Sequence, residues 1–278
     1  MSISSAITQA QQRVANAYTA INNKGGTLPQ TQNLANMPTA ISSIPSDKIK
    51  YGASIDNFLG NTSGGTLQKS TYATDFVFNG VANIGLNALL FKFVGMIVSS
   101  ISFPDLTSIT GSSACRNAFD STTGSGGITT VSMPNLQTIW GGSACQYMFS
   151  GCSWLKTITF PSLINIRGIG DCMYMFNSCT NLETAYFPLL NYIGTWGCQA
   201  MFSGCSKITD VYFNSLTTSS FGDTGCFTGL LLSTGTSVTH TLHFPSNLQS
   251  AVEGLSGYPL FGGSSGYVTI AFDLPQTS

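Results

Sequence analysis

Charged side chains are scarce in this sequence. Lys, Arg, Asp and Glu make up 8% of the 278 residues, whereas a globular domain contains about 25%. The formal net charge of −1 gives no electrostatic attraction to nucleic acid or to an anionic membrane. The hydrophobic content of 42% is ordinary and excludes a disordered chain. We therefore expect a folded protein whose surface consists mainly of Ser, Thr, Asn and Gly, as in exposed fibres and adhesins.

Two kinds of targeting segment are also missing. Residues 1–5 have no basic stretch followed by an apolar run, so we expect no secretory signal peptide. Residues 81–98 approach the length of a membrane span, but Asn83, Asn87 and Lys92 interrupt the run. We therefore expect no membrane insertion.

Residue patterns that carry chemistry are equally sparse. His240 and His243 are the only histidines, and no Cys-x-x-Cys pair occurs. No Ser-His-Asp spacing, recurrent acidic pair or glycine-rich phosphate loop is present. We expect no enzyme activity, no metal and no cofactor. A glycan depolymerase remains an alternative, because two carboxylates about 5–10 Å apart can come from distant loops.

What the sequence does contain is a repeat. Met-Phe recurs at 148–149, 175–176 and 201–202, at intervals of 27 and 26 residues. Each copy also carries a spaced apolar motif, such as Leu155, Ile158 and Phe160, in which the last two residues alternate with an outward one. This alternation predicts a half-buried strand, which Pro161 then ends because proline cannot donate to a strand ladder. A fixed period of this length predicts a solenoid, whose units need their neighbours to bury one face.

The cysteines follow the same period. Five fall in one column of the repeat and three in a second, and they are Cys115, Cys145, Cys172, Cys198 and Cys226, then Cys152, Cys179 and Cys205. Cysteine packs as a small apolar side chain, so we interpret the columns as buried thiol ladders. The even total leaves disulfide pairing open as an alternative, and a zinc site would need four convergent ligands.

The repeat resembles the BspA-like leucine-rich repeat, with its pattern Phe-x-x-Cys-x-x-Leu-x-x-Ile-x-Phe-Pro-x-Leu-x-x-Ile, over roughly residues 88–250. The resemblance implies a mainly β fold: a leucine-rich-repeat solenoid of about six 26–30-residue repeats with a small N-terminal α-helical segment. We divide the chain into a helical attachment segment (1–47), a connecting module (48–86), the solenoid (87–250) and a C-terminal cap (251–278). That family serves as a display scaffold on bacterial surface proteins and phage tail proteins.

The N-terminal residues show a heptad-like pattern. Apolar side chains spaced by four and three residues predict a helix over 3–22, with a seam that includes Ile3, Ile7, Val14 and Ile21. One interpretation is an amphipathic helix that packs on its own domain, and the other is a homo-oligomeric bundle. Residues 17–44 and 51–61 resemble short modules of phage and prophage tail proteins. This resemblance implies attachment to other virion proteins through the N-terminus.

One outward column of the predicted strands is rich in aromatic and polar residues. It contains Ser102, Ser132, Thr159, Tyr186, Tyr212 and His243, and its flanks add Asp210 and His240. Trp154 directly precedes one of the strands. Aromatic residues with polar neighbours on an exposed face are typical of glycan or protein recognition. Our receptor-binding candidates are therefore Trp154, Tyr186, Tyr212, Asp210, His240 and His243, although Tyr and Thr also favour strands without any binding role.

Together these features favour a phage virion protein, a tail or head fibre or adhesin that binds a host-surface glycan or protein. The expected location is the virion, because a protein released by lysis needs no signal peptide. Two alternatives are a bacterial cell-surface adhesin of the same repeat type and a structural decoration protein that contacts only other virion proteins.

We predict that the N-terminal helix makes the protein a homo-oligomer, most simply a trimer, because isoleucine at both seam positions disfavours dimers. Deleting residues 1–25 should therefore yield a smaller species by light scattering. A deletion variant that keeps the full-length oligomer size and an intact solenoid would remove the helix from that role.

Overall fold

The computed structural model describes residues 11–18, 49–51, 74–78, 80–89, 98–121 and 127–276. Residues 1–48 and 49–278 form two separate compact units. In the first unit residues 11–18 are helical, with Val14 half-buried and Tyr18 buried. Ile3, Ile7 and Ile21, the other seam positions, lie outside the described residues. In the described part of the chain no helix is long and apolar enough to cross a membrane.

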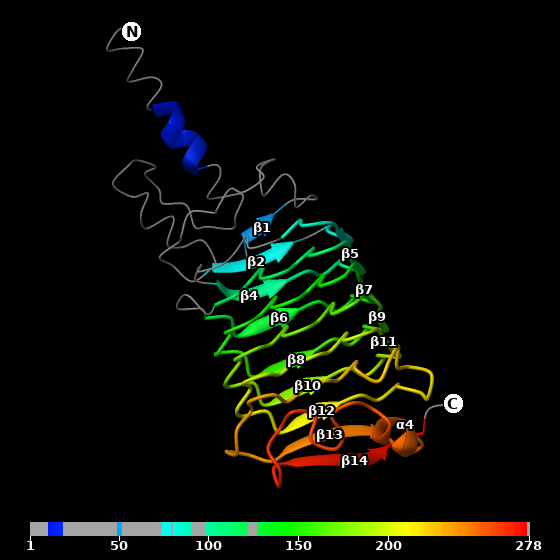
Figure 1. Ribbon diagram of the computed structural model, residues 1–278. Coiled ribbons are helices and arrows are strands. Elements are labelled where there is room, and N and C mark those ends of the chain that lie inside the picture. Colours follow the sequence, from blue (N-terminus) through cyan, green and yellow to red (C-terminus); the bar gives the residue numbers. More distant parts are fainter. Residues whose placement is uncertain are drawn as a thin grey trace. The chain divides into compact units, whose positions relative to one another are not determined.

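The second unit is a solenoid with two faces of parallel strands (Figure 1). The first face consists of two sheets, in the orders β1-β2-β4-β6 and β8-β10-β12-β13-β14. Their bounds are β1 (Ile49–Tyr51), β2 (Thr74–Phe78), β4 (Val98–Ser102), β6 (Thr130–Ser132), β8 (Thr157–Thr159), β10 (Thr184–Tyr186), β12 (Asp210–Tyr212), β13 (His240–Pro245) and β14 (Val268–Leu274). The second face is one sheet of β3 (Asn83–Ile84), β5 (Ser108–Thr110), β7 (Thr138–Trp140), β9 (Asn165–Ile166) and β11 (Tyr192–Ile193).

A single turn shows how the sequence produces this path. In β8 the side chain of Ile158 points inward between the exposed Thr157 and Thr159. Pro161 follows and turns the chain toward β9, which buries Ile166 on the second face. A series of tight turns then returns the chain to β10, whose Ala185 lies in register beside Ile158. The mainly β solenoid predicted from the repeat is therefore confirmed.

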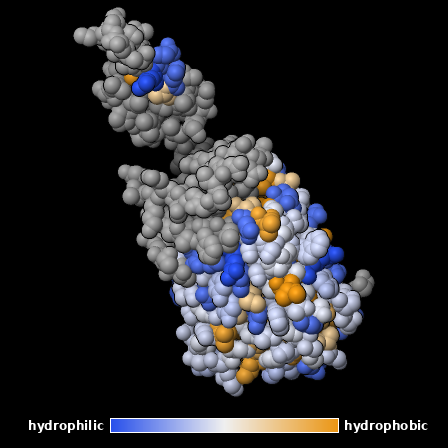
Figure 2. All heavy atoms as spheres, turned by 45° about the horizontal axis from the view of Figure 1, so that its top comes forward, coloured by the Kyte–Doolittle hydropathy of each residue, from blue (hydrophilic) through white to orange (hydrophobic). Residues whose placement is uncertain are grey.

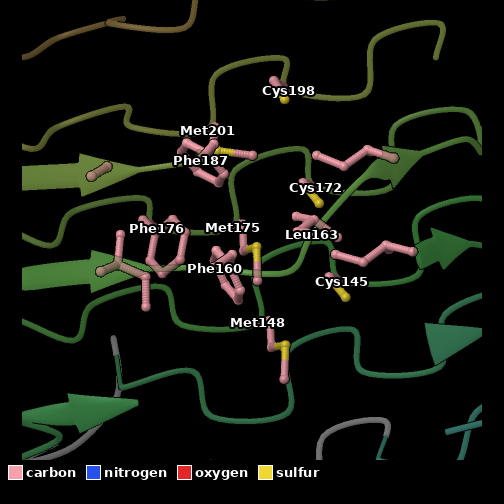
Figure 3. Close-up of a cluster of buried hydrophobic side chains, with 14 of the residues drawn as sticks. Cys145, Met148, Phe160, Leu163, Cys172, Met175, Phe176, Phe187, Cys198 and Met201 are labelled. Atoms are coloured by element: carbon pink, nitrogen blue, oxygen red, sulfur yellow. The ribbon is translucent and has the colours of Figure 1, made fainter. Parts of the chain in front are cut away.

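The core consists of columns of identical or similar side chains. Phe160, Phe187 and Phe213 stack with ring centroids 5.8 and 5.5 Å apart. A second column, which includes Phe149 and Phe176, stacks at 5.6 Å. Figure 3 shows Phe160, Phe176 and Phe187 beside methionines that include Met175 and Met201. Because the spacing approaches that of neighbouring strands, about 4.8 Å, each ring fills the space directly beside its copy in the next turn.

The cysteines form the predicted columns. All eight are free and buried, and Figure 3 shows Cys145, Cys172 and Cys198 at equivalent places in successive turns. In the second column each thiol also links two turns, because Cys179 Sγ donates to the Phe149 carbonyl at 3.2 Å and Cys205 Sγ to the Phe176 carbonyl at 3.0 Å. The thiols therefore serve as both apolar filling and weak inter-turn hydrogen-bond donors.

The tight turns that close each repeat form a third ladder. Backbone N–H groups donate alternately within the turn and to the next turn, as in Cys145 N to Asp171 O at 2.7 Å and Phe149 N to Met175 O at 2.9 Å. This geometry places residues such as Tyr147, Tyr174 and Ala200 at φ values near 50°. The left-handed region costs a non-glycine residue about 1–2 kcal/mol, and the inter-turn hydrogen bonds hold these residues there.

Parallel strand pairing extends beyond residues 87–250 at both ends. β3 pairs with β5 in parallel before residue 87, and β14 pairs with β13 after residue 250. The alternating Val268, Ile270 and Phe272 lie in β14, the edge strand at this end, and are half-buried against the core. A short helix, α4 (Gln249–Glu253), buries Val252 beneath this end.

Burial raises the pKa of six thiols, Cys145, Cys152, Cys172, Cys179, Cys198 and Cys226, with that of Cys226 reaching about 12. These thiols stay protonated in the folded protein, whereas thiols of the unfolded chain ionise near pH 8.5. The unfolded state thus binds fewer protons above that pH, so the free energy of unfolding should fall between about pH 8.5 and 12, by roughly 1.4 kcal/mol per thiol and pH unit. Urea unfolding at pH 7.5, 9 and 10 measures the slope.

The matched control is Cys172→Ala, which removes one buried thiol and should make the decline with pH shallower. Equal slopes for this variant and the wild type would contradict the assignment of the alkaline sensitivity to the cysteine columns.

Candidate functional site

The solenoid surface is uncharged over most of its area. Figure 2 shows pale residues of intermediate hydropathy over much of the visible face, with isolated hydrophobic and hydrophilic positions among them. Exposed aromatic residues therefore stand out as candidates for recognition. Four of the six sequence-predicted candidates, Tyr186, Tyr212, Asp210 and His243, come together on the first strand face.

Three rings of this group form one stack, which we call the ring column. Tyr186 on β10, Tyr212 on β12 and His243 on β13 occupy the same outward position of successive strands. The Tyr186 and Tyr212 centroids are 4.7 Å apart and the rings lie 4° from parallel. Tyr212 and His243 are 4.3 Å apart and 8° from parallel. Parallel strand pairing in register thus stacks the rings face to face along the solenoid axis.

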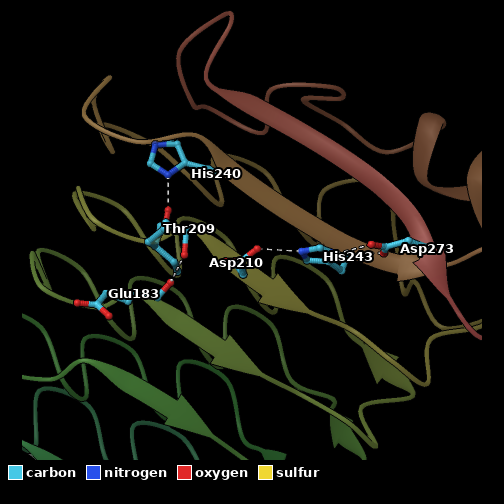
Figure 4. A network of polar contacts seen from close by, with 7 residues as sticks. Glu183, Thr209, Asp210, His240, His243 and Asp273 are labelled. Atoms are coloured by element: carbon cyan, nitrogen blue, oxygen red, sulfur yellow. Dashed lines mark hydrogen bonds and ion pairs between the residues drawn. The ribbon is translucent and has the colours of Figure 1, made fainter.

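Two carboxylates hold the imidazole at the end of this column. His243 Nε2 lies 3.0 Å from Asp210 Oδ1, and Nδ1 lies 3.0 Å from both carboxylate oxygens of Asp273 (Figure 4). Carboxylates only accept hydrogen bonds, so both contacts are hydrogen bonds when the ring is the doubly protonated imidazolium. The three residues come from β12, β13 and β14, so the network ties together the last three strands of the solenoid.

The environment of Tyr212 reflects its place between two rings. Desolvation raises the pKa of its phenol, and the nearby Asp210 carboxylate raises it further. Tyr212 therefore remains a neutral hydrogen-bonding group well into the alkaline range.

His240 is not a surface residue, and its assignment as a receptor-binding candidate is wrong. It is 1% exposed, and its Nδ1–H donates to the Ile208 carbonyl at 2.5 Å. Its backbone N–H also donates to Tyr267 O. These bonds hold the residue between turns. In β13 His240 shares the inward side with Leu242 and Phe244, so strand alternation also predicts a buried ring. Figure 4 shows the ring at the start of β13, apart from the Asp210–His243–Asp273 network.

Trp154 is exposed, as expected, with 62% of its surface accessible. It lies in the loop before β8, in the column that contains Asn181 and Lys207 in later turns. The Lys207 ammonium donates to Asn181 Oδ1 at 2.7 Å. Trp154 therefore belongs to a loop column and not to the ring column.

A second stack of aromatic rings was not predicted from the sequence. Tyr147 and Tyr174 lie in the tight-turn ladder with centroids 4.9 Å apart and rings 2° from parallel. The signal was present, because both tyrosines directly precede the Met-Phe pair of their repeats. Asp273 was also missed, since no repeat partner marks its position in β14.

The buried acidic residue Asp171 has a structural role. Its Oδ2 accepts the N–H of Gly168 at 2.6 Å, and its Oδ1 accepts the N–H of Ala144, in the preceding turn, at 3.3 Å. Burial raises the pKa of this carboxyl, and the backbone hydrogen bonds oppose that rise. Across the residues that the structure describes, no group of three His, Cys, Asp or Glu side chains is arranged to hold a metal ion.

Comparison with models of protein families identifies the repeat. The family model described as BspA type Leucine rich repeat region matches residues 93–248 in six copies. The match covers more than half of the chain and coincides with the turns that carry the ring column. A search of curated protein sequences finds no match.

We predict that Tyr212→Ala destabilises the solenoid more than Tyr186→Ala. Tyr212 loses stacking on both faces, whereas Tyr186 loses it on one, and each aromatic pair contributes about 0.5–1.5 kcal/mol beyond burial. Thermal unfolding of the two variants measures the difference. A Tyr186→Ala variant that is as unstable as Tyr212→Ala would contradict the stacking account.

Proposed function

The chain belongs to the BspA-type leucine-rich-repeat family, and from that premise we propose that it is a non-enzymatic display protein of a phage virion. In this proposal the solenoid is the host-binding part of a tail or head fibre or adhesin, and the N-terminal segment attaches it to other virion proteins. After release, the protein acts outside the cell on the particle.

The observation that carries this proposal is the ring column on a rigid strand face. Backbone ladders on both sides of each strand fix the positions of Tyr186, Tyr212 and His243 before any ligand arrives. Aromatic residues held in this way lose little conformational entropy on binding. Such a face suits recognition of a neutral surface, such as a glycan or an uncharged protein patch.

The N-terminal sequence supports a virion context. Residues 17–44 and 51–61 resemble modules of phage tail proteins, and the heptad-like spacing over 3–22 favours an oligomer. Several solenoids on one particle would bind together. Linked binding sites gain roughly 10²–10⁴-fold in avidity without any new contact, so each solenoid needs only a weak site.

The family match favours a second candidate equally, a bacterial cell-surface adhesin of the same repeat type. Both candidates use the solenoid to display a binding face, and they differ in what carries it. The location of the protein therefore separates them.

Mass spectrometry of purified particles and of washed cell envelopes from the source strain makes this test. The proposal expects peptides of this chain in the particle fraction together with capsid and tail peptides. Peptides found only in the envelope fraction would overturn the virion assignment and favour the cell-surface adhesin.

A further inference from the structure

We propose that the face binds the ring of a neutral hexopyranose, which stacks on Tyr186 at the point where the ring column stops. This inference rests on the proposed display function and names the ligand class of that same face. Three observations support it: the open face of the Tyr186 ring, the row of hydroxyl side chains beside that ring, and the charged residues nearby.

Only one ring of the column has a face available for stacking. Tyr212 is covered on both sides, by Tyr186 at 4.7 Å and by His243 at 4.3 Å. The His243 side chain is 12% exposed and its nitrogens face Asp210 and Asp273. Tyr186 is 37% exposed and stacks on Tyr212 through one face, so its other face is the one directed at the preceding turn.

The column changes abruptly at that preceding turn. The residue in register with Tyr186 is Thr159 on β8, an exposed residue with a short side chain. The same outward position holds Ser132 at the end of β6 and Ser102 at the end of β4. A wall formed by the Tyr186 ring therefore stands beside a row of small hydroxyl side chains. We call this arrangement the Tyr186 step.

The space beside Tyr186 has room for one more stacked ring. Successive rings of the column are separated by about one strand spacing, roughly 4.8 Å. A ligand ring stacked on Tyr186 at that distance would lie over Thr159 and continue the column. Thr157 and Thr184 flank the position, and their hydroxyl oxygens lie 3.4 Å apart.

A pyranose ring matches these features on both sides. One face of the ring presents C–H groups, which pack on an aromatic face, and its edge presents hydroxyls, which both donate and accept hydrogen bonds. Threonine and serine hydroxyls also donate and accept. A purely apolar ligand would make no hydrogen bonds with this row of hydroxyl side chains.

The surrounding charges favour a neutral sugar over an acidic one. Lys156 and Glu183 directly precede β8 and β10, and both are exposed. Their opposite charges lie in adjacent turns, because Glu183 N donates to Lys156 O at 2.8 Å. Farther along the column stand the carboxylates of Asp210 and Asp273. A carboxylated sugar would therefore meet more negative than positive charge on this face.

The test measures binding of simple sugars to the full-length protein by saturation-transfer NMR. The probes are the methyl glycosides of glucose, galactose, mannose and N-acetylglucosamine, with methyl glucuronide as the acidic comparison. We expect a saturable signal from at least one neutral glycoside and a weaker one from the glucuronide. Tyr186→Phe should bind like the wild type, and Tyr186→Ala should bind roughly tenfold more weakly.

The sharpest variant is Thr159→Ile, which covers the open face of Tyr186 with a longer aliphatic side chain and adds no new ring face. It should abolish the sugar signal while the melting temperature stays the same or rises, because aromatic and β-branched side chains pair favourably across neighbouring strands. Tyr174→Ala, which removes a ring from the separate Tyr147–Tyr174 stack, is the matched control and should bind normally. Absence of binding to every neutral glycoside, or unchanged binding by Thr159→Ile, would overturn the proposal.

Cell binding separates this inference from the proposed function. If labelled Thr159→Ile protein binds host cells as well as labelled wild-type protein does, the sugar site is overturned and the display function still stands. A sugar signal that Thr159→Ile abolishes supports the site even if the chain proves to be a cell-surface protein and not part of a virion.

Discussion

Hydrogen bonding between successive turns is the interaction on which the rest of this structure depends. Strands on two faces and tight turns on the third all donate to the next turn of the chain. One turn alone would expose a row of unpaired backbone groups and an apolar face, which explains why the units need one another. Once the backbone spacing is set, equal side chains in successive turns fall directly beside each other.

The inner and outer columns follow from the same spacing. Inside the solenoid it stacks Phe160, Phe187 and Phe213 and lines up the cysteines as buried thiols. Outside, it stacks Tyr186, Tyr212 and His243, and the carboxylates of Asp210 and Asp273 hold the imidazole at the end of the stack. The fold therefore produces a rigid aromatic surface wherever aromatic residues recur at an outward position. It also produces a step wherever that recurrence ends, as at Thr159.

This regularity explains how much of the molecule was predictable. The period of the Met-Phe pairs and the cysteines specified the solenoid, the strand faces and the buried columns, because every repeat reports the same environment. Residues without repeat partners were harder. The burial of His240 follows from its alternation with Leu242 and Phe244, which its place in a flanking column obscured. Asp273 lies where the register between β13 and β14 shifts, and no repeat pattern predicts that it reaches His243.

The ring stacking was also not readable from the sequence alone. Column alignment placed Tyr186, Tyr212 and His243 on one face. It did not show that Tyr186 and His243 cover the two faces of the Tyr212 ring. That detail decides which ring can contact a ligand. The repeat period places Tyr147 and Tyr174 at equivalent positions, but it does not show that they point outward, because residues with positive φ angles follow neither strand alternation nor helical spacing.

Hydrogen exchange across the solenoid tests the central role of the inter-turn bonds most directly. The account predicts strongest protection for amides that donate between middle turns, such as Cys172 and Phe176, with protection declining turn by turn toward β3 and β14. Weak protection of the middle-turn amides, or equally slow exchange at the ends and the centre, would contradict a structure held together by contacts between neighbouring turns.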